Sequence, residues 1–274
     1  MNQEFKLLTV LAHPDDESLG FGGTLAKYAA DGIAIYLVTA TRGECGRFGP
    51  LGNRGDPVEV GRIREGELRS AAAVLGIREV SVLGYPDGGV DQVEAGIAIR
   101  DIVSHIRRIQ PHVVLSFGPE GAYGHPDHIA ISQFTTAAIV CAADAEYYID
   151  GGSQGDVPPC HRVAKLYYLA WRSNKWEAYQ TAFRKLTSLV DGVQRQATPW
   201  PDWAVTTEID TSAFWRIVWK AVCCHQTQMS IYERLGDLTE EQQRALWGSQ
   251  EFYRLYSSVN SGRKPENDLF EGLQ

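Results

Sequence analysis

Two short motifs in the sequence combine imidazole and carboxylate groups at a spacing that suits metal chemistry. The first is His13-Pro14-Asp15-Asp16, and the second, much further along the chain, is His125-Pro126-Asp127-His128. Zinc binds imidazole nitrogen and carboxylate oxygen readily, and three protein ligands leave a fourth position for water. Bound zinc lowers the pKa of that water toward about 7, which makes hydroxide available at neutral pH. The two motifs together predict a hydrolytic metal site.

The residues beside the candidate ligands are suited to moving protons. Asp15 adjoins Asp16, and a carboxylate next to the reacting water can act as a general base. A histidine that is not a ligand can stabilise an oxyanion or protonate a leaving amine. A lone histidine or aspartate at a strand end is usually a cap or a surface residue. Two such motifs, each after an apolar strand, favour metal binding over that interpretation.

Both motifs follow apolar runs of strand length. Residues 7–12 and 113–117 are typical of parallel strands that are buried on both faces. Further strands are expected over 33–39 and 79–83, and helices over 18–30, 58–75 and 93–109. This alternation predicts a Rossmann-like, three-layer αβα fold with a mostly parallel sheet. Because ligands bind outside the carboxyl ends of strands in such sheets, we expect the two motifs to meet at one edge.

The second half of the chain has a less regular pattern. Strands are expected over 165–170 and 205–209, a loop over 150–159, and helices over 211–227 and 240–257. The sequence contains no internal repeat and no low-complexity linker. We therefore predict a single domain over residues 1–274, with a Rossmann-like core in residues 1–145 and a C-terminal elaboration in residues 146–274.

Composition and charge restrict the class of partner. The chain has 274 residues, and its 44% apolar and 22% charged content is ordinary for a globular protein. A formal net charge of -8 argues against a nucleic acid and against an anionic membrane surface as partners. No stretch approaches the roughly 20 apolar residues of a membrane span. Five scattered cysteines and no signal-peptide pattern predict a cytoplasmic protein that acts on a small molecule.

A glycine-rich stretch, Gly20-Phe21-Gly22-Gly23, introduces the alternative of a nucleotide-binding or regulatory module. A dinucleotide fingerprint needs Gly-x-Gly-x-x-Gly or Ala directly after the first strand. Here Leu25 stands at the third glycine position, and seven residues separate Ala12 from Gly20. We interpret these glycines as sites of close packing between a helix and the sheet.

The stretch from Ala12 to Glu17, together with residues 125–128, resembles the PIG-L-like deacetylase family. That family includes N-acetylglucosaminylphosphatidylinositol deacetylases, enzymes of mycothiol and bacillithiol synthesis, tailoring deacetylases of glycopeptide antibiotics, and amidases of thiol conjugates. The resemblance covers residues 5–134, and residues 220–228 look like a further family element. It implies a Rossmann-like fold and zinc-dependent removal of an acetyl group from an N-acetylglucosamine-type conjugate. An amidase that cleaves a larger conjugate at the same centre is the alternative.

The resemblance also bears on the metal, the oligomeric state and, carried over by motif, the roles of single residues. Iron(II) is an alternative to zinc in a site with two histidines and one carboxylate. Family members are often oligomers, so a homo-oligomer is one of the states that the resemblance allows. The implied metal ligands are His13, Asp16 and His128, the implied general base is Asp15, and the implied oxyanion or acid group is His125, oriented by Asp127.

Four further positions match family residues that contact the substrate or line the site. Arg64 and Asp87 match contacts to the sugar, Tyr123 matches a mobile tyrosine at the pocket, and Glu44 is expected to line the site. Three of the four have a plainer interpretation. Arg64 can be a helix-surface charge paired with a nearby glutamate, Asp87 can be a turn former, and Tyr123 can be a packed loop aromatic. His225, in the element at 220–228, can be a core histidine.

Overall fold

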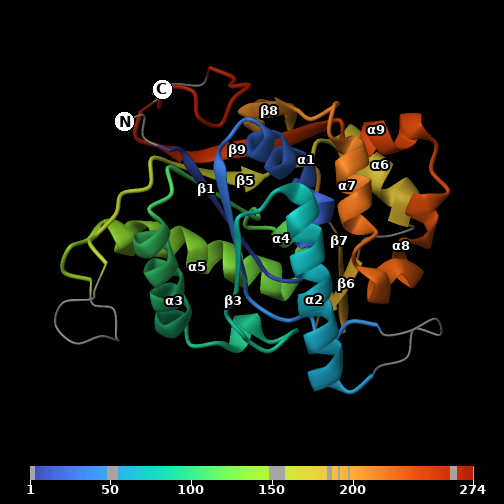
Figure 1. Ribbon diagram of the computed structural model, residues 1–274, viewed down its shortest axis with the longest axis horizontal. Coiled ribbons are helices and arrows are strands. Elements are labelled where there is room, and N and C mark those ends of the chain that lie inside the picture. Colours follow the sequence, from blue (N-terminus) through green and yellow to red (C-terminus); the bar gives the residue numbers. More distant parts are fainter. Residues whose placement is uncertain are drawn as a thin grey trace.

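The chain is built around a seven-stranded sheet, shown in a computed structural model that describes residues 4–47, 55–147, 158–183, 187–190, 192–196, 198–259 and 264–273. The strand order is β3-β2-β1-β4-β5-β9-β8 (Figure 1). The first five strands in this order are parallel, and β9 runs antiparallel to both of its neighbours. The strands are β1 (Lys6–Leu11), β2 (Ala34–Thr39), β3 (Glu79–Val82), β4 (Val113–Ser116), β5 (Lys165–Leu169), β8 (Thr207–Asp210) and β9 (Ser249–Ser257).

Helices cover both faces of the sheet. On one face, α3 (Ala95–Ile109) packs against α5 (Pro126–Ala143), and both contact β1. On the other face, α1 (Asp16–Ala30), α2 (Pro57–Leu75) and α7 (Trp215–Val222) pack against one another (Figure 1). The predicted three-layer αβα fold with a mostly parallel sheet is confirmed.

The central strands form for the reason that the sequence indicates. β4 is buried along its whole length, and β1 is buried after its first residue, which matches their continuous apolar runs. The helix α2 ends at Gly76, whose φ of 77° is the left-handed conformation that glycine adopts without strain. The strands expected over 33–39, 79–83, 113–117, 165–170 and 205–209 are present as β2, β3, β4, β5 and β8.

The C-terminal half differs most from expectation. The single helix expected over 240–257 is wrong, because α9 (Glu240–Trp247) ends before Gly248 and β9 follows at once. The aromatic side chains of Phe252 and Tyr253 are those of a strand that inserts between β5 and β8. The helix expected over 211–227 is shorter, because Thr211 binds the carbonyl of Trp247 instead of starting a helix.

Several elements of this half carry no helical or strand signal that we recognised. They are α6 (Ser173–Phe183), the hairpin of β6 (Thr187–Val190) and β7 (Val193–Gln196), η2 (Asp202–Ala204) and α8 (Met229–Gly236). The short helix η3 (Gln226–Gln228) overlaps the end of the helix expected over 211–227. Residues 150–157 of the expected loop lie outside the described residues. The strands β5, β8 and β9 extend the same sheet as β1 to β4. Within the described part of the chain, no helix has both the length and the apolar character to span a membrane.

Candidate metal and catalytic site

The two motifs meet where the order of the strands reverses. The chain moves outward from β1 to β2 and β3, then returns to place β4 on the other side of β1. A crevice forms outside the carboxyl ends of strands at such a switch point. A cavity of about 390 Å³ lies there. Its wall includes His13, Asp15, Asp16, Arg64, Asp87, Phe117, Tyr123, His125, His128, Trp171, Tyr179, Gln228, Ile231 and Tyr232.

Four ligand atoms of the predicted set lie close together, namely one nitrogen of each histidine and both oxygens of Asp16. His13 Nδ1 is 3.1 Å from His128 Nε2, and His128 Nε2 is 3.4 Å from Asp16 Oδ1. The other oxygen of Asp16 lies 3.7 Å from His13 Nδ1. A tetrahedral zinc with bonds of about 2.0–2.2 Å holds its ligand atoms roughly 3.3–3.5 Å apart. The spacing of the three side chains therefore fits such an ion.

His13 is oriented by two carboxylates on the side of its ring away from His128. Its Nε2 lies 3.0 Å from Asp127 Oδ2 and 3.2 Å from Asp87 Oδ1. A proton on Nε2 leaves Nδ1 with a lone pair, and metal-binding histidines are commonly held in this way. Burial opposes a charged ring, but hydrogen bonds to Asp127 and Asp87 raise the pKa of His13 well above its ordinary value.

Burial shifts the pKa of both other candidate ligands toward the neutral form of the group. Burial lowers the pKa of His128 well below its ordinary value, and the neighbouring His13 and His125 lower it further. Burial raises the pKa of Asp16 to about 7, although the charge of His13 acts in the opposite direction. A divalent ion would stabilise both the lone pair of the neutral imidazole and the ionised carboxylate. The donor set therefore fits a divalent metal.

Other compact groups of ligand atoms overlap this trio. Among the described residues, His13, His125 and His128 form one, and His13, Asp87 and Asp127 form another. In the second, the hydrogen bonds of His13 Nε2 already account for the short distances. In the first, His125 Nδ1 accepts the N–H of Asp127 at 3.2 Å, so only its Nε2 remains for other contacts.

Asp15 has a strained backbone and a well-anchored carboxylate. Its φ of 108° lies in a region that non-glycine residues rarely adopt. Its Oδ2 accepts hydrogen bonds from Arg64 Nη2 at 2.9 Å and from the Tyr232 hydroxyl at 2.6 Å. Its Oδ1 accepts none from the described residues, and Asp15 lines the cavity. One oxygen is therefore held while the other remains available for a proton.

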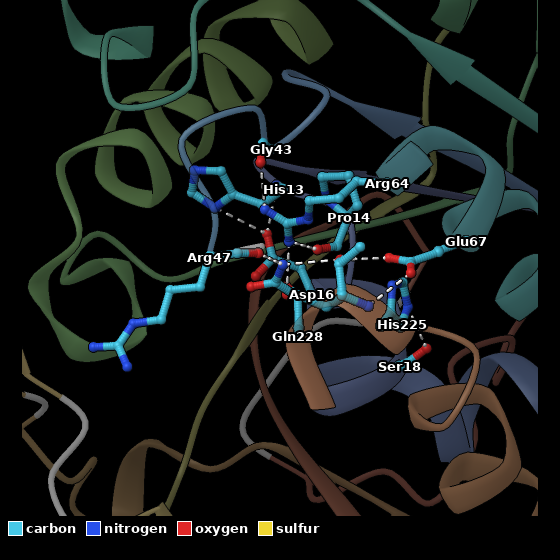
Figure 2. A network of polar contacts seen from close by, with 12 residues as sticks. His13, Pro14, Asp16, Ser18, Gly43, Arg47, Arg64, Glu67, His225 and Gln228 are labelled. Carbon is cyan, nitrogen blue, oxygen red and sulfur yellow. Dashed lines mark hydrogen bonds and ion pairs between the residues drawn. The ribbon is translucent and has the colours of Figure 1, made fainter. Parts of the chain in front are cut away.

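Arg64 is buried beside the cavity, so it is not a charge on the helix surface. The residue is only 4% exposed, and its guanidinium donates to the carbonyls of Gly43 and Pro14 at 2.6 Å each, besides Asp15 (Figure 2). A Cβ atom at Gly43 would collide with this guanidinium. Arg64 borders the cavity, but its described contacts brace Asp15 and its neighbours.

The carboxylate of Asp127 orients His13 instead of the predicted His125. Besides His13, it accepts the backbone N–H groups of Gly88 and Val90 at 2.7 and 3.1 Å. His125 is tied only to the backbone of Asp127, whose N–H points to Nδ1. Burial lowers the pKa of His125 to about 4, and the charge of His13 lowers it further. The neutral ring therefore carries its proton on Nε2, and it can donate a hydrogen bond without being charged.

The remaining predicted residues divide between the cavity and its support. Asp87 lines the cavity, and its Oδ2 accepts the N–H of Cys45 at 2.8 Å. Tyr123 also lines it, with its ring packed edge-on against His128. Glu44 differs from expectation, because it is not part of the wall. Its Oε1 instead accepts the N–H of Asp87 at 2.9 Å.

Several residues of the cavity wall come from the second half of the chain. Tyr232 and Ile231 lie on α8, Gln228 lies in η3, Trp171 precedes α6, and Tyr179 lies on α6. Two stretches of this half give a signal in the sequence: residues 220–228 resemble a family element, and the tryptophan-rich stretch from Trp171 to Trp203 is a candidate for the wall of a substrate pocket. No local pattern points to Ile231 and Tyr232, because α8 was not predicted.

Comparison with known proteins agrees with this geometry. The family described as GlcNAc-PI de-N-acetylase, PIG-L, matches residues 8–139. The 1D-myo-inositol 2-acetamido-2-deoxy-alpha-D-glucopyranoside deacetylase of Streptomyces scabiei (strain 87.22) is 34% identical, over 98% of this chain and 90% of its own. A mycothiol S-conjugate amidase of Streptomyces coelicolor (strain ATCC BAA-471 / A3(2) / M145) is 29% identical, over 100% and 99%. The N,N'-diacetylchitobiose deacetylase from Pyrococcus horikoshii has the same fold, with a TM-score of 0.66 at 18% identity over 91% and 83%.

Proposed function

We propose a specific reaction from the premise that this chain belongs to the PIG-L family. The chain is an amide-hydrolysing enzyme, since the relatives that match nearly its whole length are deacetylases and an amidase. We propose that it removes the acetyl group from an N-acetylglucosamine-type conjugate. The observation that carries this proposal is the cluster of His13, Asp16 and His128 beside the carboxylate of Asp15. Oδ1 of that carboxylate accepts no hydrogen bond from the described residues.

We assign the metal to the side chains of His13, Asp16 and His128. Their spacing and the neutral imidazole of His128 support this assignment. Zinc is the metal that we propose, and iron(II) suits the same donor set. When bound, the metal polarises the amide carbonyl and lowers the pKa of the reacting water.

The side chains of Asp15 and His125 carry the proton chemistry. Asp15 Oδ1 accepts a proton from the water while the water oxygen bonds to the amide carbon. The Nε2–H of neutral His125 donates a hydrogen bond to the carbonyl oxygen as negative charge develops there. The carbon–nitrogen bond then breaks, and Asp15 passes its proton to the leaving nitrogen. Acetate and a free amino sugar are the products.

The substrate assignment rests on the relatives and on the size of the cavity. The Streptomyces scabiei relative is named for an acetamido sugar linked to inositol. A cavity of about 390 Å³ falls in the range of small-molecule sites, roughly 300–1,000 Å³. The amidase relative favours the second candidate, cleavage of a larger amide at the same centre. The five free cysteines support a reducing, cytoplasmic setting for the reaction.

A nucleotide-binding role has little support from the packing of the glycine-rich stretch. A Cβ atom at Gly20 would contact Leu169, and one at Gly22 would contact Val218. At Gly23 the added atom would lie 2.7 Å from Thr211. Side chains therefore occupy the space beside these glycines, where a phosphate cradle would need open backbone.

Metal reconstitution tests the proposed function directly. The protein is stripped with a chelator, reloaded with zinc or, without oxygen, with iron(II), and assayed for amine release. We expect release from N-acetylglucosamine conjugates only after reloading. Release from larger amide conjugates alone would favour the amidase. No release from either class by the reloaded protein would contradict both.

The matched variant for this assay is Asp15→Ala. We expect it to retain the metal while kcat falls by about 10²–10⁴-fold, the usual contribution of a general base. Metal content is measured by elemental analysis on the same sample as kcat. Near-full activity in this variant would remove Asp15 from the mechanism.

A further inference from the structure

A buried glutamate–histidine pair lies directly behind the proposed catalytic residues. Glu17 and His225 are both 0% exposed, and His225 Nε2 is 2.8 Å from Glu17 Oε1. The Ser18 hydroxyl donates to the same oxygen at 2.5 Å. Neither Glu17 nor His225 is a candidate metal ligand, and neither lines the cavity. The pair therefore needs an explanation other than contact with metal or substrate.

Burying such a pair is costly, and the local packing does not remove the cost. Desolvation of two charged groups is repaid only by good geometry and further hydrogen bonds. The second ring nitrogen of His225, Nδ1, is buried without a partner among the described residues. Apolar side chains of similar size would fill this space without that penalty. What the apolar pair would lack is the second oxygen of Glu17.

That second oxygen binds the backbone of Asp15. Glu17 Oε2 accepts the N–H of Asp15 at 3.0 Å. The carbonyl of Pro14, on the other end of the same peptide unit, accepts from Arg64 Nη2 at 2.6 Å. The Pro14–Asp15 peptide plane is thus held at both polar groups. The φ angle of Asp15 is the rotation about its N–Cα bond, which joins this peptide plane to the rest of the residue. By fixing the plane, the two contacts help to hold the strained φ of 108°.

We propose that the Glu17–His225 pair is a positioning element, which holds the Pro14–Asp15 peptide so that the Asp15 carboxylate stays in its reactive position. His225 reaches Glu17 from the segment after α7, and Figure 2 shows it beside Ser18 on the side of Pro14 away from Gly43. The C-terminal half thereby orients the proposed base through the backbone, in addition to the Tyr232 hydroxyl on its carboxylate. This inference rests on the proposed role of Asp15.

Variants of Glu17 separate positioning from simple packing. Glu17→Ala removes the acceptor for the Asp15 N–H, and Glu17→Gln keeps an acceptor oxygen. We expect Glu17→Ala to lower kcat by about 10²-fold, as a small misplacement of a reacting group does, with KM and metal content unchanged. Glu17→Gln should recover most of this loss. Equal losses of kcat in the two variants, or a loss that follows metal content, would overturn the proposal.

A double-variant cycle gives a readout that a merely structural role would not move. If Glu17 acts through Asp15, Glu17→Ala should cause no further loss of kcat in an Asp15→Ala background. An additional loss there of the same size as in the native background would contradict the proposal. If Glu17→Ala does not fold, His225→Ala takes its place in the same double-variant cycle. It should lower kcat in the native background and not in the Asp15→Ala background.

Glu67→Ala is the matched control. Glu67 binds the N–H and the hydroxyl of Thr227, so it anchors the same C-terminal segment without touching Asp15. We expect its kcat to stay close to that of the native enzyme. Crystal structures of the Glu17 variants keep this test independent of the proposed function. Asp15 should lose its positive φ in Glu17→Ala and keep it in Glu17→Gln, even if no substrate is found, and an unchanged φ in Glu17→Ala would contradict the proposal.

Discussion

Asp15 occupies a helix N-cap position without acting as a cap. N-cap aspartates usually have an extended backbone and a side chain that accepts from the first turn of the helix. Asp15 has a φ of 108° and no side-chain cap hydrogen bond. Its carboxylate instead accepts from Arg64 and Tyr232. The helix α1 thus begins with a side chain that is withheld from capping and directed toward the cavity, which is a cost in local stability at a functional position.

The protonation of His125 leads to a prediction at the same scale. If the neutral Nε2–H is the group that stabilises the oxyanion, an amide donor should replace it in part. His125→Ala is expected to lower kcat by about 10²–10³-fold, the usual cost of losing such a donor. His125→Gln should lose clearly less activity in the same assay of kcat. Equal losses would indicate that a charged imidazolium is required, against the lowered pKa of His125.

At the scale of elements, the glycines of α1 determine how closely this helix approaches its neighbours. Gly20 faces Leu169 of β5, Gly22 faces Val218 of α7, and Gly23 faces Thr211. The predicted close packing is therefore found, but two of the three contacts lie in the C-terminal layer and not in the sheet. Since α1 begins at the metal motif, its seating also places Asp16.

A pair of glycine substitutions tests this close approach. Gly23→Ala puts a Cβ atom 2.7 Å from Thr211 Cβ, so it should lower the free energy of unfolding by about 1–3 kcal/mol through overpacking. Gly66→Ala, in the exposed part of α2 with no atom within 4 Å, should raise it by about 0.5–1 kcal/mol. Urea unfolding of both variants measures the two values. A neutral result for Gly23→Ala would mean that α1 can move away at no cost.

At the scale of the whole molecule, the C-terminal segment closes the fold over its beginning. The ring of Phe270 packs against Phe5 and Tyr28. Glu266 is 4% exposed and accepts from Lys165 Nζ at 2.9 Å, while the whole Lys165 residue is buried. Glu266, Leu269 and Phe270 are therefore buried against the elaborated sheet.

Removing the Glu266 carboxylate should show how much the buried contact with Lys165 contributes to stability. Glu266→Ala leaves Lys165 buried without its acidic partner, so we expect a loss of about 3–5 kcal/mol in the free energy of unfolding. The control is Glu208→Ala on β8, whose carboxylate is half-exposed and pairs with Arg172. That change should cost about 0–1 kcal/mol. Similar losses for the two variants, measured by denaturant unfolding, would contradict a special role for the buried pair.

The sequence by itself determined the parts of the protein that depend on local pattern. Continuous apolar runs predicted β1 and β4. The two motifs follow the carboxyl ends of these strands, and the carboxyl ends of parallel strands lie at the same edge of a sheet, so the motifs were expected to meet. The residue types and spacing of the motifs at 13–16 and 125–128 predicted a metal-binding chemistry in the same way, and the resemblance to a known family implied which of these residues are ligands. These inferences need only neighbours in the chain and the topology of a doubly wound sheet.

Only the tertiary structure decided how each side chain is used. Arg64, Asp127 and Glu44 all turned out to hold other residues of the site, and no pattern in their own neighbourhoods indicates which partner they reach. Tyr232 and His225 join Asp15 and Glu17 from more than 200 residues away. Such contacts depend on how α1, α7 and α8 pack. Packing is set by the fit of whole surfaces, which hydrophobic periodicity along one segment does not contain.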